Sequence, residues 1–223
     1  MMLEVNEIGF IGRVVDVFVI TADQIDSRVQ DDRVTAELAR ITAEHGASLA
    51  LPADRTAGDE LQVLTAEPTT AFALAMELTR TRAFHVGIGI GPVRRPLPKT
   101  TREASGPAFF AARDAATRAK GSGVRLAVQM QTAPEGKSAK ATDAEALLGL
   151  LLILRERRSD AGWELYDLLQ EGLTQADAAA RLGISAPAAS ARAKAAHLRA
   201  EAAASDPLVR LLEQTDRATE SEG

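Results

Sequence analysis

The chain has 223 residues, of which 46% are hydrophobic, and its formal net charge is −5. This length allows one large domain with an ordinary core and one smaller domain. The absence of cysteine excludes disulfides and Cys-ligated metal sites, and an aromatic content of 4% argues against stacking platforms for single-stranded nucleic acid. The opening MMLEVNEIGF lacks the basic head and apolar run of a signal peptide, and the longest apolar stretch, 146–154, is too short to span a membrane. We therefore expect a cytoplasmic protein with no membrane partner.

The first ninety residues alternate between strand-like and helix-like patterns. Residues 14–20, VVDVFVI, are mostly β-branched, as in a buried strand, and apolar residues in 29–45 recur at helical spacing before Gly46. The pattern then predicts strands at 48–51 and 61–64 around a Gly-containing turn, a helix at 68–81 and a strand at 85–90. The predicted order, β-α-β-β-α-β, is typical of the ferredoxin-like arrangement.

A basic segment follows. Ten Lys and Arg residues occur from Arg80 to Arg125, against only two acidic residues. Such a segment in an acidic protein indicates an anionic partner, either nucleotide or nucleic acid, or it is a solvated surface loop. Within and after it we expect a helix at 107–119 and a strand near 124–130.

The rest of the chain reads as helical. We predict an α+β domain at 1–131, a linker at 132–143 that is rich in small residues and Lys, and a helical region at 144–223. Residues 144–157 are apolar on almost every turn, so we expect them to be buried between the two halves or in a dimer interface.

Two aspartates are the first candidate ligands. Asp23 comes at the end of an apolar strand, and Asp59 lies at the tip of the predicted hairpin, beside Gly58. In a β-α-β-β-α-β sheet these strands are neighbours, so the two carboxylates can converge. Paired carboxylates together with substrate phosphates are the usual way to hold Mg²⁺. Asp is also a common turn former, which is the structural alternative. No histidine shows metal-ligand spacing, so His45, His85 and His197 are expected to be structural or exposed.

Four strings occur in order: ITADQIDSR, RTAGDELQVL, VGIGIGPV and SGPAFFAAR. Together they resemble the nucleotidyl cyclase-like domain of the class III cyclase and diguanylate cyclase superfamily, and more closely the SatD-like proteins. The resemblance covers roughly residues 13–130 and implies a nucleotide bound with Mg²⁺ or Mn²⁺.

The resemblance also implies roles for individual residues. Asp23 and Asp59 fall at the two metal-binding aspartates of the superfamily. Arg55 falls where adenylate cyclases have a purine-reading lysine, Arg28 ends the Asp-Ser-Arg string and is a nucleotide-binding candidate, and Arg113 falls at the transition-state arginine. A surface ion pair is the alternative role for Arg113.

Two departures argue against catalysis. Phe109 replaces the asparagine that cyclases carry four residues before that arginine, and it cannot hydrogen-bond a ribose. The hairpin reads Ala-Gly-Asp-Glu-Leu rather than the Gly-Gly-Asp/Glu-Glu-Phe of diguanylate cyclases. We therefore assign no catalytic residue, and expect nucleotide binding without turnover.

Residues 173–198 predict two helices around a tight turn. Thr174 and Ser185 are suited to cap them, and Gly183 to end the first. The string LTQADAAARLGISAPAASARAKAA resembles the helix-turn-helix of sigma-factor region four and LuxR-type regulators, whose second helix enters the DNA major groove. The resemblance gives these DNA-binding candidates: Gln175, Ser185, Ser190, Arg192 and Lys194. Residues 160–201 carry six acidic against four basic residues, so a dimer is needed for affinity, and a helical hairpin used for dimerisation is the alternative.

The sequence thus favours an α+β, ferredoxin-like cyclase-like domain followed by an all-α helix-turn-helix domain. The expected function is a homodimeric regulator that binds double-stranded DNA and whose first domain binds a purine nucleotide or serves as a dimer scaffold. The alternatives are an active Mg²⁺-dependent nucleotidyl cyclase or transferase with a helical tail, and an interaction module with neither activity.

Overall fold

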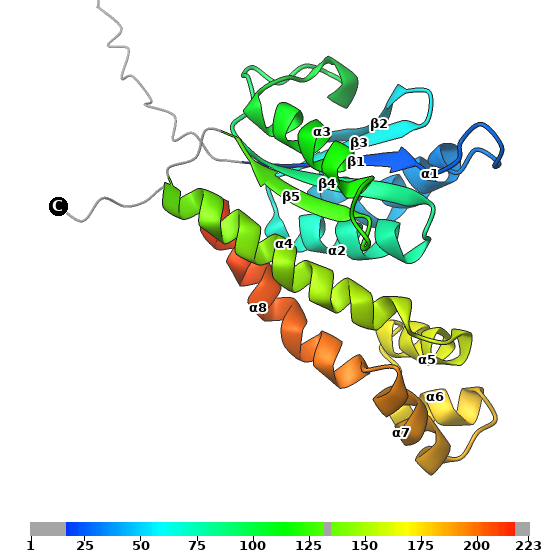
Figure 1. The fold of residues 1–223 in the computed structure, drawn as a ribbon. Helices are drawn as coiled ribbons and strands as arrows, with labels where there is room; N and C mark the ends of the chain where they lie inside the picture. The colour runs from blue at the N-terminus through cyan, green and yellow to red at the C-terminus, as the bar shows by residue number, and fades with distance from the viewer. Residues whose placement is uncertain (1–16, 132–134, 217–223) are drawn as a thin grey trace, which may run out of the picture.

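The computed structural model describes residues 17–131 and 135–216 of the chain. These residues form a mixed α+β protein in which helices cover both faces of one sheet (Figure 1). The strands are β1 (Val17–Gln24), β2 (Leu51–Ala57), β3 (Glu60–Thr65), β4 (Phe84–Gly91) and β5 (Leu126–Met130). The α-helices are α1 (Val34–His45), α2 (Pro68–Arg80), α3 (Pro107–Ala119), α4 (Glu135–Glu156), α5 (Asp160–Gln170), α6 (Gln175–Arg181), α7 (Ala186–Ala195) and α8 (Leu198–Asp216).

The strands of the described sheet lie in the order β2-β3-β1-β4-β5. The central strand β1 is antiparallel to both β3 and β4, and β5 is parallel to β4. In this register Asp23 lies opposite Glu60 on one side and His85 on the other. The end of β1 therefore lies beside the β2–β3 hairpin and the start of β4.

Large apolar side chains fill one face of the sheet. Phe18, Ile20 and Ala22 alternate along β1 and belong to the main core with residues of α1, α2, α4 and α8. Burial on both faces explains why the strands read as nearly continuous apolar runs. This face therefore contains most of the apolar burial that stabilises the fold.

The other face is covered by α3 at very close range. A Cβ on Gly87 or Gly89 of β4 would lie 2.2 Å from backbone atoms of α3, so no side chain fits between strand and helix. Ala108 and Ala112 are the α3 residues at the Gly89 contact, and both are fully buried. The alternating glycines of VGIGIG are therefore a packing requirement of α3.

The helices after β5 extend the molecule away from the sheet. The first part of α4 and the last part of α8 pack together against the sheet, and Ala144, Leu148 and Leu212 belong to the main core (Figure 1). Helices α5, α6 and α7 lie at the far end of α4 and α8 and have a small apolar cluster of their own. Residues 144–157 thus bury one side against the sheet domain.

Four boundaries differ from the sequence predictions. The strand expected at 48–51 is β2 (Leu51–Ala57), because residues 46–48 form a short 3-10 helix. β1 is paired through Gln24, so Asp23 lies inside the strand instead of after it, and the predicted start at 14–16 lies outside the described residues. The helix expected from 29 begins at Val34, because the Asp32 carboxylate accepts the Val34 N–H at 3.0 Å. The predicted linker 132–143 is helical from Glu135 onward, and 132–134 lie outside the described part.

Candidate functional site

The two aspartates predicted to bind metal lie at the same end of the sheet. Asp23 is on β1, and the Gln24 N–H donates to the Asp59 carbonyl oxygen at 2.9 Å, which fixes the hairpin turn beside the strand end. We call Asp23, Asp59, His85 and Lys120 together the sheet end. The convergence expected from the sequence depends on this backbone hydrogen bond.

Both carboxylates have protein partners. Lys120, directly after α3, places its Nζ 2.6 Å from Asp23 Oδ2, and the Ser27 hydroxyl donates to Asp59 Oδ2 at 2.5 Å. The Asp23 side chain is 20% exposed and that of Lys120 is 52% exposed. The ammonium group therefore lies against Asp23 as a metal ion would.

The donor chemistry fits a divalent cation only in part. Two carboxylates suit a hard cation that retains some of its water. A cation bound to Asp23 must displace Lys120, and the exposed end of that side chain allows such a movement. When bound with a nucleotide, the metal would neutralise phosphate charge beside these two residues.

His85 also belongs to the sheet end. Burial lowers the pKa of His85 below its usual value, although the nearby Asp23 carboxylate acts in the opposite direction. Lys120 and Arg125 add to the lowering of this pKa. The lowered pKa keeps the His85 imidazole neutral near neutral pH.

The three nucleotide-binding candidates differ in their surroundings. Arg55 donates to both oxygens of Asp32, at 2.5 and 2.7 Å, and to the Gly58 carbonyl oxygen at 2.8 Å, so it ties the hairpin to the start of α1. Hydrogen bonds from Thr35 and then from Arg55 hold the pKa of Asp32 below its usual range. Arg113 is exposed on α3 and Arg28 is exposed in the loop after β1. Within the described structure, the side chains of Arg28 and Arg113 make no hydrogen bond or ion pair.

Phe109 is 5% exposed and packs in the small cluster beneath α3. Phe109 is therefore part of the core, whereas the neighbouring Phe110 is 55% exposed.

Most of the basic segment is neutralised inside the protein. Arg80 pairs with Asp167, Arg118 with Glu145 and Arg125 with Glu156, in addition to the Lys120 pair. Arg102, from the irregular arm, pairs with Asp54. Among the described residues, the basic side chains of this segment without a hydrogen bond or ion pair are Arg94, Arg95, Lys99 and Arg113. The ten basic and two acidic residues give this segment a net charge of +8, but five of its basic side chains pair with carboxylates of the protein. Less positive charge is therefore available to a partner than the sequence indicates.

Helices α6 and α7 form a compact pair, which with the turn between them we call the α6–α7 unit. The Thr174 hydroxyl accepts the Asp177 N–H at the start of α6, and the Ser185 hydroxyl accepts the Ala188 N–H at the start of α7. Gly183 in the turn has φ +66°, a conformation that favours glycine. Ala178 and Ala189 are fully buried where the small side chains allow close packing.

The DNA-binding candidates differ in their surroundings. Gln175, Ser190 and Lys194 are exposed, and in the part of the chain that the structure describes their side chains have no protein partner. Ser185 is used as a helix cap. Arg192 forms an ion pair with Glu164 of α5, with 3.5 Å between Arg192 Nη1 and Glu164 Oε2, and its side chain is 25% exposed.

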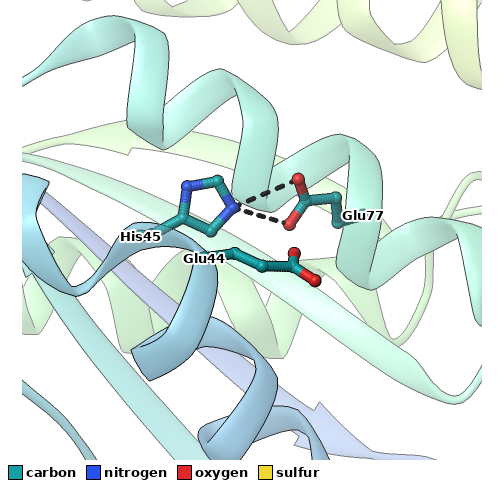
Figure 2. A group of neighbouring side chains, drawn as sticks. All are labelled: Glu44, His45 and Glu77. Atoms are coloured by element: carbon teal, nitrogen blue, oxygen red, sulfur yellow. Dashed lines mark hydrogen bonds and ion pairs between the residues drawn. The ribbon is translucent and has the colours of Figure 1, made fainter. Parts of the chain in front are cut away.

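A cluster that the sequence did not indicate lies between α1 and α2. His45 Nε2 is 2.9 and 3.1 Å from the two oxygens of Glu77, and Glu44 lies beside them (Figure 2). Arg40 Nη1 is 2.7 Å from both Glu44 Oε2 and Glu77 Oε2. Burial would lower the pKa of Arg40, but the hydrogen bond and charge of Glu77, together with Glu37, raise it above its usual value. The arginine thus compensates the carboxylates, and the cluster joins two helices.

We call α5, α6 and α7, with the adjoining ends of α4 and α8, the helical lobe. A buried ionic network lies in this lobe, and Arg155 Nη2 also donates to the Met76 carbonyl oxygen of α2 at 3.1 Å, which joins the lobe to the sheet domain. Arg155 and Arg158 of the α4–α5 corner both pair with Glu201 of α8, and all three side chains are at most 8% exposed. Arg80, Arg155 and Arg158 stand over the ring of Trp163, at 4.2, 4.8 and 4.3 Å from its centroid. The only sequence signal for this network is that the single Trp and single Tyr of the chain fall in α5.

The comparisons with known proteins identify no relative. No protein-family model matches the sequence, and no curated protein matches it. Among the residues that the structure describes, no helix has the length and apolar character needed to cross a membrane.

Proposed function

We propose that the protein is a homodimeric DNA-binding regulator in which the α6–α7 unit contacts double-stranded DNA. The observation that carries this proposal is that the outer side of α7 is exposed, while a tight turn joins α7 to the capped helix α6. Gln175, Ser190 and Lys194 need no rearrangement to reach a partner. A second helix presented in this way is the arrangement that helix-turn-helix proteins use in the major groove.

In this proposal Arg192 pairs with Glu164 in the free protein and becomes available when DNA binds. At 3.5 Å from an exposed carboxylate, its ion pair with Glu164 is weak, because water screens both groups. A DNA phosphate offers the same guanidinium a stronger, bidentate partner. Arg192 would therefore exchange Glu164 for DNA on binding.

Dimerisation through α4 and α8 is the second part of the proposal. Leu147, Leu150 and Ile153 are 48%, 61% and 45% exposed, which is unusual for side chains of this size. An apolar groove of about 320 Å³ runs beside them, lined by leucines of α4 and by Ala200, Ala204, Pro207 and Leu208 of α8. A two-fold interface presents the same patch twice, so a leucine ridge beside a groove of small residues can fit a second copy of this chain.

The sheet domain is the proposed nucleotide-binding or scaffolding half. The strand order and the element order agree with a ferredoxin-like, cyclase-like domain. The proposed ligands for a metal–purine nucleotide complex remain Asp23, Asp59, Arg28 and Arg113. Arg55 is proposed to act indirectly, through its hydrogen bond to the β2–β3 hairpin. In this proposal the metal displaces Lys120 from Asp23 when the nucleotide binds.

DNA retention tests the function directly. The full chain is incubated with a pool of random duplexes at low salt, and the retained fraction is compared in a gel shift with two variants. Arg192→Ala should weaken the shift, whereas Glu164→Gln should bind at least as tightly as the wild type because it releases Arg192 and removes a negative charge. Absence of retention at low salt would overturn the proposal.

The competing enzyme function is tested separately with ATP or GTP and Mg²⁺ or Mn²⁺. A cyclic or linked nucleotide product that disappears in Asp59→Ala would replace our proposal with a nucleotidyl cyclase or transferase. An interaction module with neither activity would show neither DNA retention nor product.

A further inference from the structure

Four arginines line a small cavity at the junction of the sheet domain and the helical lobe. Arg80 and Arg82 come from the end of α2 and the turn after it, Arg125 from the turn before β5, and Arg155 from the end of α4. The remaining lining includes Glu156, its only carboxylate, and the ring of Trp163. Four chain segments, at 79–82, 124–125, 152–156 and Trp163, therefore meet around a strongly basic hollow.

The charges around this cavity do not balance. The four lining arginines and Arg158 behind Trp163 face three carboxylates. Glu156 pairs with Arg125, Asp167 with Arg80, and Glu201 is shared by Arg155 and Arg158. Buried charges are normally compensated, because burial in a medium of low dielectric constant is costly for an unpaired ion. Arg155 and Arg158 are the buried arginines of this group, and they share one carboxylate, so one buried positive charge remains uncompensated.

Buried hydrogen-bond donors are also left over. The Nε–H groups of Arg125 and Arg155 are buried and have no partner, and Arg155 is only 4% exposed as a residue. Buried polar groups in folded proteins nearly always have a partner, so an orphaned guanidinium donor indicates a missing acceptor. A carboxylate-like or phosphate-like oxygen is the acceptor that a guanidinium prefers.

The backbone supports the same conclusion. Arg82 and Arg125 both have φ +56°, in the left-handed region that residues other than glycine rarely adopt. This conformation places Arg82 Nη2 2.6 Å from the Glu156 carbonyl oxygen. Two arginines in a costly conformation at one cavity suggest that their positions are functionally constrained.

We propose that this cavity binds a small tetrahedral oxyanion, either free phosphate or the terminal phosphate of a small metabolite. The space open to the centre of a water-sized sphere is about 20 Å³, where a single water needs about 10–15 Å³. The space admits one or two oxygen atoms of an oxyanion, with the remainder of the group or of a larger molecule directed to solvent past the exposed Arg80 and Arg82. Bound phosphate would accept the orphaned Nε–H groups and join the α4–α5 corner to the sheet. This site is independent of the proposed function and of the Asp23–Asp59 pair.

Trp163 provides the readout, because it is the only tryptophan of the chain and lines the cavity. Its fluorescence is titrated in the full chain with inorganic phosphate, with glycerol phosphate, and with chloride at matched ionic strength. We expect a saturable change with phosphate and none with chloride. Saturation by inorganic phosphate alone assigns the site to the free ion, and saturation by the ester as well assigns it to a terminal phosphate group.

Two variants test the assignment without touching the buried Glu201 network. Arg82→Ala and Arg125→Gln should each weaken phosphate binding about tenfold or more, the usual effect of losing one charge-assisted hydrogen bond. Arg33→Ala, which removes an exposed arginine directly before α1, should titrate like the wild type, and circular dichroism confirms that each variant is folded. A response that does not saturate, that chloride reproduces, or that is unchanged in both cavity variants would overturn the proposal.

Discussion

The sheet end and the α6–α7 unit were both predicted to bind a ligand, but the fold treats their polar groups differently. At the sheet end, Asp23 and Asp59 each have a protein partner, in Lys120 and Ser27. In the α6–α7 unit, three of the five predicted contacts are exposed and unpartnered within the described residues, namely Gln175, Ser190 and Lys194. A polar group that is already satisfied gains little from a new partner, whereas an exposed one exchanges only water. The comparison therefore places binding at α7 ahead of metal chemistry at Asp23.

The largest expected effect separates α3 from the sheet. In Gly89→Val, the new side chain would overlap backbone atoms of Ala108 and Ala112, which lie 2.2 Å from the ideal Cβ. The sheet end would lose the helix that leads to Lys120, and we expect a loss of more than about 4 kcal/mol in the free energy of unfolding. Urea denaturation measures it. Gly123→Val, where the Cβ meets nothing within 4 Å, is the control, and equal stability of the two variants would contradict the packing described here.

A slightly smaller effect should detach the helical lobe. Glu201→Ala leaves Arg155 and Arg158 buried without their shared carboxylate, which should cost about 3–5 kcal/mol. Thermal unfolding followed by Trp163 fluorescence checks this, with Glu171→Ala on the exposed end of α5 as the control. If the two variants differ by less than about 1 kcal/mol, the network does not hold the lobe.

An effect of intermediate size is expected in the pH dependence of stability, through His85 at the sheet end. Because the folded-state pKa of His85 is lowered, the unfolded chain binds a proton that the folded chain does not as the pH falls through about 6.5. Stability from this residue is thus fully present above that pH and decreases below it, by at most about 1.4 kcal/mol per pH unit. Denaturation at pH 7.5 and 5.5 should show a smaller loss in His85→Gln than in the wild type. The exposed His197→Gln should keep the wild-type loss.

The smallest stability effect should come with a gain in metal binding. Lys120→Ala removes a half-exposed ion pair, so the free energy of unfolding should change by less than about 1 kcal/mol. The released Asp23 should then bind Mn²⁺ more tightly than in the wild type, as calorimetry can measure. The double variant Lys120→Ala with Asp23→Asn should lose this gain. Equal Mn²⁺ binding in all three proteins would show that Lys120 does not compete with a cation.

The local sequence was sufficient for four of the five described strands and for the helices of the α6–α7 unit, but it predicted β2 too early in the chain. β-branched runs such as VFVI and the spacing of Thr174, Gly183 and Ser185 depend on neighbouring residues alone, and the structure confirms these elements. The alternating glycines of VGIGIG were read as a strand end, yet their contact with α3 depends on residues about twenty positions later.

Long-range pairs escaped prediction. Glu77 is 32 residues from His45, and Glu201 is 43 residues from Arg158, so no spacing rule links them. Lys120, beside Asp23, directly follows α3 almost a hundred positions after Asp23, so no sequence signal indicated its competition for the proposed metal site. The segment 132–143 looked like a linker because of its composition, but α4 gains its stability from packing of Ala141 and Ala144 against the core.

The salt dependence of DNA binding tests the central claim most directly. Fluorescence anisotropy with a selected duplex gives the association constant at several salt concentrations for the wild type, Lys194→Ala and the control Arg113→Ala. If Lys194 contacts a phosphate, its loss should weaken binding and reduce the slope of log K against log salt by about one, whereas Arg113→Ala should match the wild type. An unchanged slope in Lys194→Ala, or no binding by the wild type at low salt, would contradict DNA recognition by α7.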